Sequence, residues 1–386
     1  MELIITTESR PIKLWLDNIE DGALAQARNL ANLPFVFRHI AVMPDAHQGY
    51  GMPIGGVMAT RDVIVPNAVG VDIGCGMCAM KTSLTEIETP ALKTIMDRIR
   101  KSVPVGFKHQ SVKQDKHLMP EIVYRHGIVE REFASALKQL GTLGGGNHFI
   151  EIQKDNDGHI WIMVHSGSRN IGLQVARHYN NVAKEANKKG YSSVPKKWDL
   201  AFLPVDTSAG KAYIDEMQYC VDFAFANRRL MMDRIMAAVT SVAPWAEFDE
   251  MINIAHNYAQ LEHHFNADVW VHRKGATMAR KGQLGIIPGS QGTPSYIVRG
   301  KGNPESFQSC SHGAGRKMGR KQAQRELNLE AEKKRLDDLG VIHSVRGKKD
   351  LDEAAGAYKN IAEVMAKQSD LVEIMVELRP LAVIKG

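Results

Sequence analysis

Apolar residues recur along this chain with two spacings, and each spacing predicts a different kind of element. Apolar positions three or four residues apart are typical of a helix that buries one face, whereas short unbroken or alternating apolar runs are typical of strands. Helical spacing predicts helices at residues 11–32, 87–100, 121–140, 170–188, 206–240 and 317–336. Short apolar runs predict strands at residues 35–43, 78–81, 149–152, 161–164, 252–256 and 370–386. No internal repeat, low-complexity tract or linker divides these elements.

The composition narrows the class of protein without identifying it. With 386 residues, 44% hydrophobic and 24% charged, the chain resembles an ordinary soluble protein with a sizeable core. It contains no apolar run of the ~18–20 residues that span a bilayer, and the N-terminus lacks a secretory signal pattern, so we expect a cytoplasmic protein without a membrane partner. The net charge of +6 is a weak indication of polyanionic partners.

The segment VGVDIGCGMCAM, residues 69–80, is the most unusual stretch of the chain. It places an acid, Asp72, and a thiol, Cys75, among glycines and apolar residues, where an ordinary buried strand has no use for either. Four cysteines in so long a chain do not form a disulfide framework, so metal or catalytic use is favoured. Cys75 and Cys78 formally match CxxC, but no second CxxC completes a four-cysteine zinc site. We therefore interpret Cys75 as a metal ligand and Cys78 as a core residue.

Three histidines stand at the ends of predicted strands or beside glycine-rich turns. His148 follows three successive glycines, His165 ends a predicted strand with Arg169 close behind, and His256 ends another. They are candidate ligands that complete a centre with Asp72 and Cys75. His263 and His264 remain unassigned.

The pair Asp45 and His47 lies in another glycine-rich loop and has two interpretations. One is a turn residue with an ordinary loop histidine. The other is support of the metal site or contact with substrate.

His312 is the candidate nucleophile. It lies in the sequence SCSHGAGR, where small neighbours leave the imidazole accessible and Arg316 supplies a nearby cation. This combination suits covalent chemistry with a phosphate.

The loop at residues 288–292, PGSQG, is a candidate anion-binding loop. The basic stretches 101–118 and 317–336 have two interpretations. The simpler one is that they are ordinary solvent-exposed segments, and the other is that they contact RNA.

Taken together, several long motifs resemble the RtcB family of RNA ligases. They are MPDAHQG, VGVDIGCGM, LGGGNHFIE, HSGSRNIG, AHN, PGS, SCSHGAGR and VIKG, and they run nearly from end to end of the chain. The resemblance implies a single compact α+β domain over residues 1–386, with mixed β-sheets, flanking helices and a metal site in a central cleft. It also implies GTP-dependent joining of RNA 3′-phosphate or 2′,3′-cyclic phosphate ends to 5′-hydroxyl ends, in RNA splicing or repair.

The same resemblance implies the site residues. Two Mn²⁺ ions would be held by Asp72, Cys75 and His148 and by Cys75, His165 and His256, with the thiolate bridging both. His312 would attack GTP to form a histidine–GMP intermediate. The GTP site would consist of Asn147, His148, Phe149, Ile150, Glu151, His256, Asn257, Pro288, Gly289, Ser290, Gln291, Ser295, His312, Gly313, Ala314, Gly315 and Lys385. Arg169 and Arg316 would contact the RNA. Manganese comes from the family, because a thiolate–imidazole–carboxylate set by itself suits zinc equally well.

Two other functions compete with the ligase. A metal-dependent phosphohydrolase acting on RNA ends or nucleotides needs the same ligands but no covalent histidine, so it would survive the change His312→Ala. A non-catalytic RNA-binding protein is disfavoured because all five ligands and the nucleophile are present. We expect a monomer, and the sequence leaves open the RNA substrate and the need for an activating protein.

Overall fold

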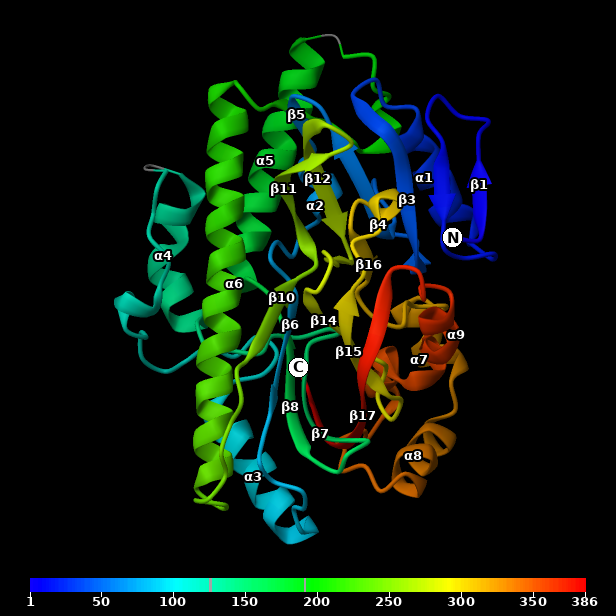
Figure 1. The fold of residues 1–386 in the computed structure, drawn as a ribbon. Coiled ribbons are helices and arrows are strands. Elements are labelled where there is room, and N and C mark those ends of the chain that lie inside the picture. The colour runs from blue at the N-terminus through cyan, green and yellow to red at the C-terminus, as the bar shows by residue number, and fades with distance from the viewer. Residues whose placement is uncertain (125–126, 191) are drawn as a thin grey trace.

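The computed structural model describes residues 1–124, 127–190 and 192–386, and within these ranges two large sheets lie end to end along the molecule (Figure 1). The first sheet has the strand order β1 (Leu3–Ile5), β2 (Ile12–Leu14), β3 (Val36–His47), β4 (Ile54–Thr60), β12 (Ala267–Lys274) and β11 (Asn257–His264). The second has the order β10 (Ile252–Ala255), β6 (Gly76–Lys81), β8 (Ile160–Ser166), β7 (Phe149–Asp155), β17 (Val372–Lys385), β15 (Ser295–Gly300) and β14 (Leu284–Ile287). Two small pairs join β13 (Ala276–Met278) to β16 (Ser309–Ser311) and β5 (Val63–Ile64) to β9 (Leu203–Pro204).

Helices cover these sheets, and the longest of them lies along both. The helix α6 (Ser208–Thr240) contacts strands of the two large sheets and runs nearly the full height of the molecule (Figure 1). The other helices are α1 (Asp21–Ala31), α2 (Pro66–Val69), α3 (Thr89–Ser102), α4 (Ile128–Gln139), α5 (Arg169–Lys189), α7 (Arg320–Glu326), α8 (Leu329–Asp338) and α9 (Ile361–Ala366). Short 3₁₀ turns are η1 (Lys116–Leu118), η2 (Lys196–Trp198), η3 (Pro304–Ser306), η4 (Lys348–Glu353) and η5 (Ala355–Ala357).

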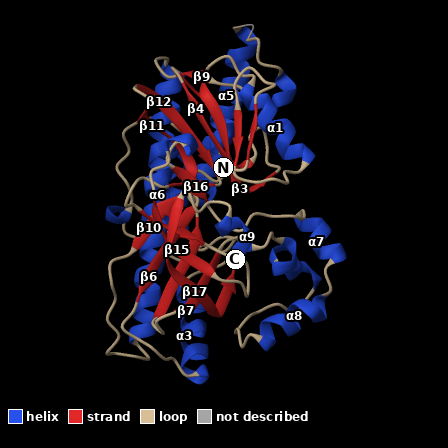
Figure 2. Cartoon of the chain, turned by 45° about the vertical axis from the view of Figure 1, so that its right-hand side comes forward, coloured by secondary structure: helices blue, strands red, loops and turns tan. Residues whose placement is uncertain are grey.

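The expected fold class is confirmed: strands and helices form an α+β protein with helices packed around the sheets (Figure 2). The first sheet is mixed because β2 pairs parallel with β3, whereas the second is antiparallel throughout its described pairs. Within the described ranges, no helix combines the length and the apolar character needed to cross a membrane.

Three predicted helices are wrong in part. Residues 11–32 do not form one helix, because Ile12 and Leu14 are fully buried in β2 against β3 and the helix begins only at Asp21. Residues 317–336 form two helices, since the side chain of Asn328 accepts from Ala331 N and starts α8 afresh. The predicted helix 121–140 is observed only from Ile128, and its positions 125–126 lie outside the described residues. The N-cap of α6 is Thr207, whose hydroxyl accepts from Gly210 N.

Candidate metal centre and nucleophile

Antiparallel pairing brings the predicted ligands to one edge of the second sheet. In the order β10-β6-β8-β7, Ala255 pairs with Gly76, Met77 with His165, and His165 with Phe149. Cys75, His148 and His256 each directly precede or follow one of these paired positions. Residues spread over much of the sequence therefore meet because neighbouring strands start and end at the same edge.

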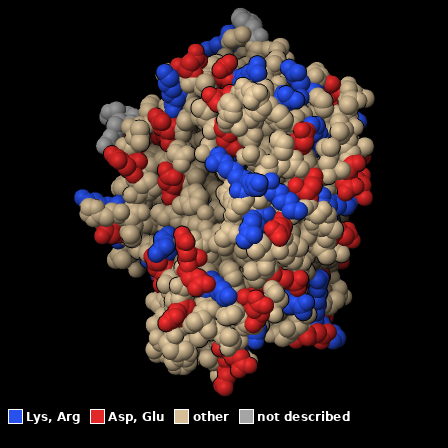
Figure 3. Space-filling model, viewed as in Figure 1, with Lys and Arg blue, Asp and Glu red and all other residues tan. Residues whose placement is uncertain are grey.

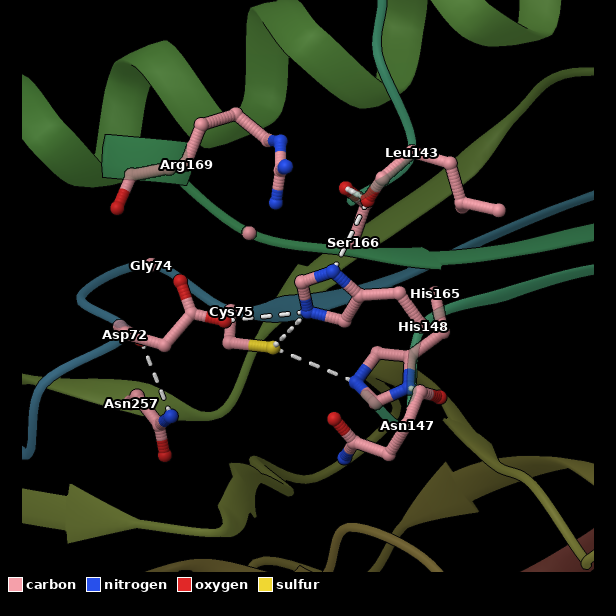
Figure 4. Close-up of polar contacts among 12 residues, drawn as sticks. Asp72, Gly74, Cys75, Leu143, Asn147, His148, His165, Ser166, Arg169 and Asn257 are labelled. Atoms are coloured by element: carbon pink, nitrogen blue, oxygen red, sulfur yellow. Dashed lines mark hydrogen bonds and ion pairs between the residues drawn. The ribbon is translucent and has the colours of Figure 1, made fainter. Parts of the chain in front are cut away.

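The side chains at this edge converge on the thiol of Cys75. Its Sγ lies 3.4 Å from His148 Nε2 and 3.3 Å from His165 Nε2 (Figure 4). Beyond this pair, His148 Nε2 is 3.1 Å from Asp72 Oδ2, and His165 Nε2 is 3.4 Å from His256 Nε2. Cys75, His148 and His165 form a buried group whose donor atoms lie within 4.8 Å of one another, which is close enough to bind one cation.

The backbone fixes how these imidazoles face. His148 Nδ1 lies 2.9 Å from Leu143 O, and His165 Nδ1 lies 3.1 Å from Asn147 O, so each Nδ1 carries the proton and donates it. Burial lowers the pKa of His165 and of His256 well below the usual value, which keeps both rings neutral. Nε2 of His148 then faces Cys75 Sγ and Asp72 Oδ2. Nε2 of His165 faces Cys75 Sγ and His256 Nε2. Sulfur, imidazole nitrogen and carboxylate oxygen are the donors that proteins offer to transition metals, so the residues fit a metal.

The protonation state of the Cys75 thiol depends on whether it binds a cation. Burial, and then the nearby Asp72 carboxylate, raise the pKa of the Cys75 thiol well above its usual value. A coordinated metal removes this proton, because metal-bound thiols ionise outright.

Glycine is required where these groups pass close to the backbone. At Gly167, an added Cβ would lie 2.2 Å from Asp72 Oδ1. At Gly144, φ is +93°, and a Cβ would lie 1.9 Å from Arg169 Nη1 and 2.7 Å from His148 Nδ1. A side chain at either position would displace a ligand or its neighbour.

His312 lies beside the metal centre, in contact with the ring of His256. The two ring centres are 4.8 Å apart at an angle of 68°. Ala276 N donates to the carbonyl of His256, and Ala276 pairs with Ser311, the residue before His312. One short strand pair thus connects the predicted nucleophile to the predicted ligands.

Asp45 holds this histidine. The expected glycine-rich loop is wrong at this point, because Asp45 and His47 lie in β3, and Asp45 supports the predicted nucleophile and does not contact the metal ligands directly. Its Oδ2 lies 2.6 Å from His312 Nδ1 and also accepts from the backbone N–H groups of His312 and Gly313 at 3.1 and 3.2 Å. Burial alone would raise the pKa of Asp45, but His312 and Lys359 outweigh it and lower the pKa, so the group is a carboxylate. A carboxylate can only accept, so Nδ1 carries a proton, and in the neutral imidazole the lone pair is therefore on Nε2.

Several residues predicted to contact the nucleotide form one hydrogen-bonded chain. Gln153 Nε2 donates to Glu151 Oε2 at 2.7 Å and lies 3.2 Å from Ser295 Oγ, which also accepts from Gly289 N at 3.1 Å. Burial raises the pKa of Glu151 to about 7. Lys385 lies opposite Phe149 in the β17–β7 pair, with its ammonium 5.8 Å from the Phe149 ring centre.

Other predicted nucleotide residues hold the loops around His312. A Cβ on Gly313 would lie 3.4 Å from Pro288 O, and one on Gly315 would lie only 2.1 Å from Asp45 O. Asn257 donates to Asp72 O at 3.1 Å and accepts from Gly275 N at 2.8 Å. Gln291 Nε2 donates to Glu353 O at 3.2 Å. These contacts bring the predicted segments together around one site.

The two arginines predicted to contact RNA both have internal partners. Arg169 extends from the start of α5 over the ligands and donates to Thr142 Oγ1 and Gly106 O. Arg316 is paired with Glu353 at 3.0 Å and donates to Met318 O and Asp352 O. Their role as RNA contacts stays a prediction.

Sequence reasoning missed Asn227 and Arg228, which are fully buried in α6. Arg228 donates to Gly74 O and Ser166 O, both at 2.9 Å. The Asn227 side chain accepts from Gly141 N and Thr142 N and donates to Gly167 O. Together they position the turns that carry Cys75, His148 and His165. The available signal was a polar Asn–Arg pair on a stripe that otherwise holds Ala, Met and Phe.

A buried thiol–imidazole–carboxylate centre beside a carboxylate-held histidine is typical of an enzyme that performs metal-assisted group transfer. Comparison with known proteins agrees. The family model described as tRNA-splicing ligase RtcB matches residues 26–128 and 122–386. The chain is 40% identical to the RNA-splicing ligase RtcB of Escherichia coli K12, over 99% of both chains. It is 32% identical to the tRNA-splicing ligase RtcB of Thermococcus kodakarensis, over 95% of this chain and 92% of that one. The chain belongs to the RtcB family.

Proposed function

We propose that this protein is a GTP-dependent RNA ligase that joins 3′-phosphate or 2′,3′-cyclic phosphate ends to 5′-hydroxyl ends. Membership of a family whose relatives are RNA-splicing ligases supports the reaction class. The observation that carries the mechanism is the position of His312, whose Nδ1 lies 2.6 Å from Asp45 and whose ring contacts a predicted metal ligand.

In the first step, His312 Nε2 attacks the α-phosphorus of GTP. Asp45 keeps the proton on Nδ1, so Nε2 has the free lone pair, and it stabilises the positive charge that the ring acquires as the N–P bond forms. The bond from the α-phosphorus to the bridging oxygen breaks, and pyrophosphate leaves. The product is GMP bound to His312 Nε2.

The next two steps transfer GMP and then release it. An oxygen of the RNA 3′-phosphate attacks the phosphorus of the histidine–GMP, the N–P bond breaks and a 3′-guanylated end forms. The 5′-hydroxyl then attacks the RNA phosphorus, loses its proton and displaces GMP, which leaves a 3′,5′-phosphodiester. A cyclic phosphate must first be opened by water to give the 3′-phosphate.

We propose two Mn²⁺ ions, one with Asp72, Cys75 and His148 and one with Cys75, His165 and His256. The central position of the Cys75 sulfur, 3.3–3.4 Å from two imidazole nitrogens, supports its role as the shared ligand. Bound metal ions polarise phosphoryl oxygens and stabilise the charge on leaving groups. Manganese is proposed from the family, since the donors alone also suit zinc.

The hydrogen-bonded chain Glu151–Gln153–Ser295–Gly289 supports a guanylate site at this end of β7. A buried carboxyl can accept from the N–H groups that distinguish guanine from adenine. For RNA, lysine and arginine side chains gather in a band across the middle of one face, at the level where the two sheets meet (Figures 1 and 3). Such a band attracts a phosphate backbone.

The test is to incubate the purified protein with Mn²⁺ and GTP labelled at the α-phosphate, followed by denaturing electrophoresis. We expect label on the parent protein that is lost in acid, and none on His312→Ala. Absence of label on the parent, together with phosphate release from RNA ends by both proteins, would replace the ligase with the phosphohydrolase.

A further inference from the structure

A basic segment, residues 103–118, forms one rim of the site. Gly106 N donates to Gly144 O at 2.7 Å, and Arg169 donates to Gly106 O. Gly144 belongs to the glycine loop whose Leu143 carbonyl faces His148 Nδ1. Two hydrogen bonds, Gly106 N to Gly144 O and His148 Nδ1 to Leu143 O, thus connect this segment to the predicted metal ligand His148.

The rest of this segment is tied to the protein surface. Gln110 N donates to Lys138 O at 2.8 Å and Gln114 N to Leu137 O at 3.0 Å, which fixes the segment against the end of α4. Gln110 Nε2 donates to Gly141 O, and Arg234 of α6 donates to the side chain of Gln114. These bonds give the segment a defined position beside the site.

Phe107 follows Gly106 directly, and its ring is fully exposed. A fully exposed aromatic ring at the rim of a site is free to stack on the face of a base. Three lysines of the same segment, Lys108, Lys113 and Lys116, are exposed, and in the described part of the chain none is within 4.0 Å of a carboxylate. The one acid in this segment is Asp115, which caps η1.

We propose that Phe107 stacks on a base of the RNA next to the end that is joined, and that Lys108, Lys113 and Lys116 bind the phosphates that follow. An exposed aromatic ring among unpaired cations is the combination that binds single-stranded nucleic acid. Stacking accepts any base, so this contact orients an unpaired end without selecting its sequence. The inference rests on the proposed RNA ligase function and names the residues that hold its substrate. A protein partner would instead require acidic groups to meet three free lysines.

The test measures binding of a short single-stranded RNA with a 3′-phosphate, and of one with a 5′-hydroxyl, without GTP. Phe107→Leu removes the aromatic face but keeps an apolar side chain, and we expect about 5- to 150-fold weaker binding of one of the two RNAs. Trp245→Leu is the matched control, because Trp245 is also an exposed aromatic residue but lies beyond the C-terminal end of α6. It should bind both RNAs like the parent.

Replacing single bases by abasic nucleotides locates the stacked base. At that position, the parent protein should bind the abasic RNA as weakly as Phe107→Leu binds the normal RNA. Combining the abasic RNA with Phe107→Leu should lower the affinity no further than either change alone. Replacing Lys108, Lys113 and Lys116 by Ala should lower the slope of log affinity against log salt by about 0.7 for each lost phosphate contact. Lys93→Ala, on the exposed face of α3, should leave the slope unchanged.

Labelling with GTP separates the two proposals. If Phe107→Leu labels like the parent and binds both RNAs like the parent, the stacking proposal is wrong and the ligase stands. If the parent itself takes no label and joins no RNA, the proposed function is wrong. Equal loss of binding in Phe107→Leu and Trp245→Leu would also overturn the stacking contact, since exposed aromatic rings would then act without regard to position.

Discussion

At the scale of single residues, one carboxylate oxygen determines the chemistry of the nucleophile. Asp45 Oδ2 receives the ring N–H and two backbone N–H groups of the His312 turn, so it fixes both the direction and the proton of the imidazole. An Asn at this position can present its N–H₂ to Nδ1 and favour the wrong tautomer.

Asp45→Asn should therefore slow labelling by GTP by about 100-fold or more, by analogy with loss of the carboxylate in catalytic triads. Single-turnover labelling with saturating GTP measures this rate. Metal content should stay at the parent value, because Asp45 contacts no predicted ligand except through His312. A labelling rate equal to that of the parent would show that Asp45 does not set the tautomer.

The two cysteines of the CxxC should respond differently to mutation. Cys75→Ala removes the proposed shared ligand, so we expect loss of both metal ions. Cys78 is buried with its thiol directed at Arg228 O, 3.9 Å away, so Cys78→Ala should keep both. Elemental analysis after equilibration with Mn²⁺ and desalting measures the content. Loss of one ion only from Cys75→Ala would contradict a bridging thiolate.

Glu151 should make the protein less stable as pH rises. Burial raises its pKa from 4.5 to about 7, so between these values the folded state binds more protons than the unfolded state and its free energy of unfolding falls. Glu151→Gln removes this loss and should stabilise the protein at pH 8 by up to about 3 kcal/mol, with a smaller gain at pH 5.5. Denaturant unfolding at both pH values measures this, with exposed Glu250→Gln as the control. An equal gain at both pH values would contradict the assignment.

At the scale of elements, an internal ion pair holds the strand that precedes His312. Arg273 on β12 is fully buried, pairs with Glu262 on β11, and donates to Phe307 O and Ser309 Oγ at 3.0 and 2.9 Å. Phe307 and Gln308 both have φ of 51°, a strained conformation for residues with a side chain. Arg273 thus stabilises the strained entry to β16.

Arg273→Met should destabilise the protein by about 3–5 kcal/mol, because Glu262 would remain buried with only His264 Nε2, 2.9 Å away, as a partner. Chemical denaturation measures this, and Arg280→Met, at an exposed arginine nearby in the sequence, should change stability little. The double variant Arg273→Met, Glu262→Gln should recover part of the loss. If the single and double variants lose equal stability, the cost arises from packing and not from the unpaired charge.

The sequence predicted which residues the fold brings together better than it predicted the element boundaries, for physical reasons. Asp72, Cys75 and His148 were identifiable because polar residues among glycines and apolar runs have few structural explanations. The role of Asp45 was left open between two interpretations. Only the fold brings β3, which carries Asp45, beside β16, which directly precedes His312. Asn227 and Arg228 were missed because helical periodicity assigns them to a buried stripe without naming their partners. The break at Asn328 was missed because strongly charged helical spacing continues across it.

At the scale of the whole molecule, α6 connects the parts. It packs on both sheets, and through Asn227 and Arg228 it bonds to the turns before β6 and after β8. If residues 1–386 are one domain, as we propose, the two sheets cannot separate without uncovering the faces of α6 that pack on them. Far- and near-ultraviolet circular dichroism should therefore report one coincident thermal transition. Two separated transitions would indicate two domains.

The long sequence separation within the site has a consequence for synthesis in the cell. Asp45 and His312 are 267 residues apart, which at about 5–20 residues per second corresponds to roughly 15–50 s of translation. Cys75 and Cys78 leave the ribosome together, roughly 10–35 s before His256 on the same scale. For the proposed two-manganese site, the ligands are therefore complete only after His256 has been synthesised, so the full metal centre can form only late in translation.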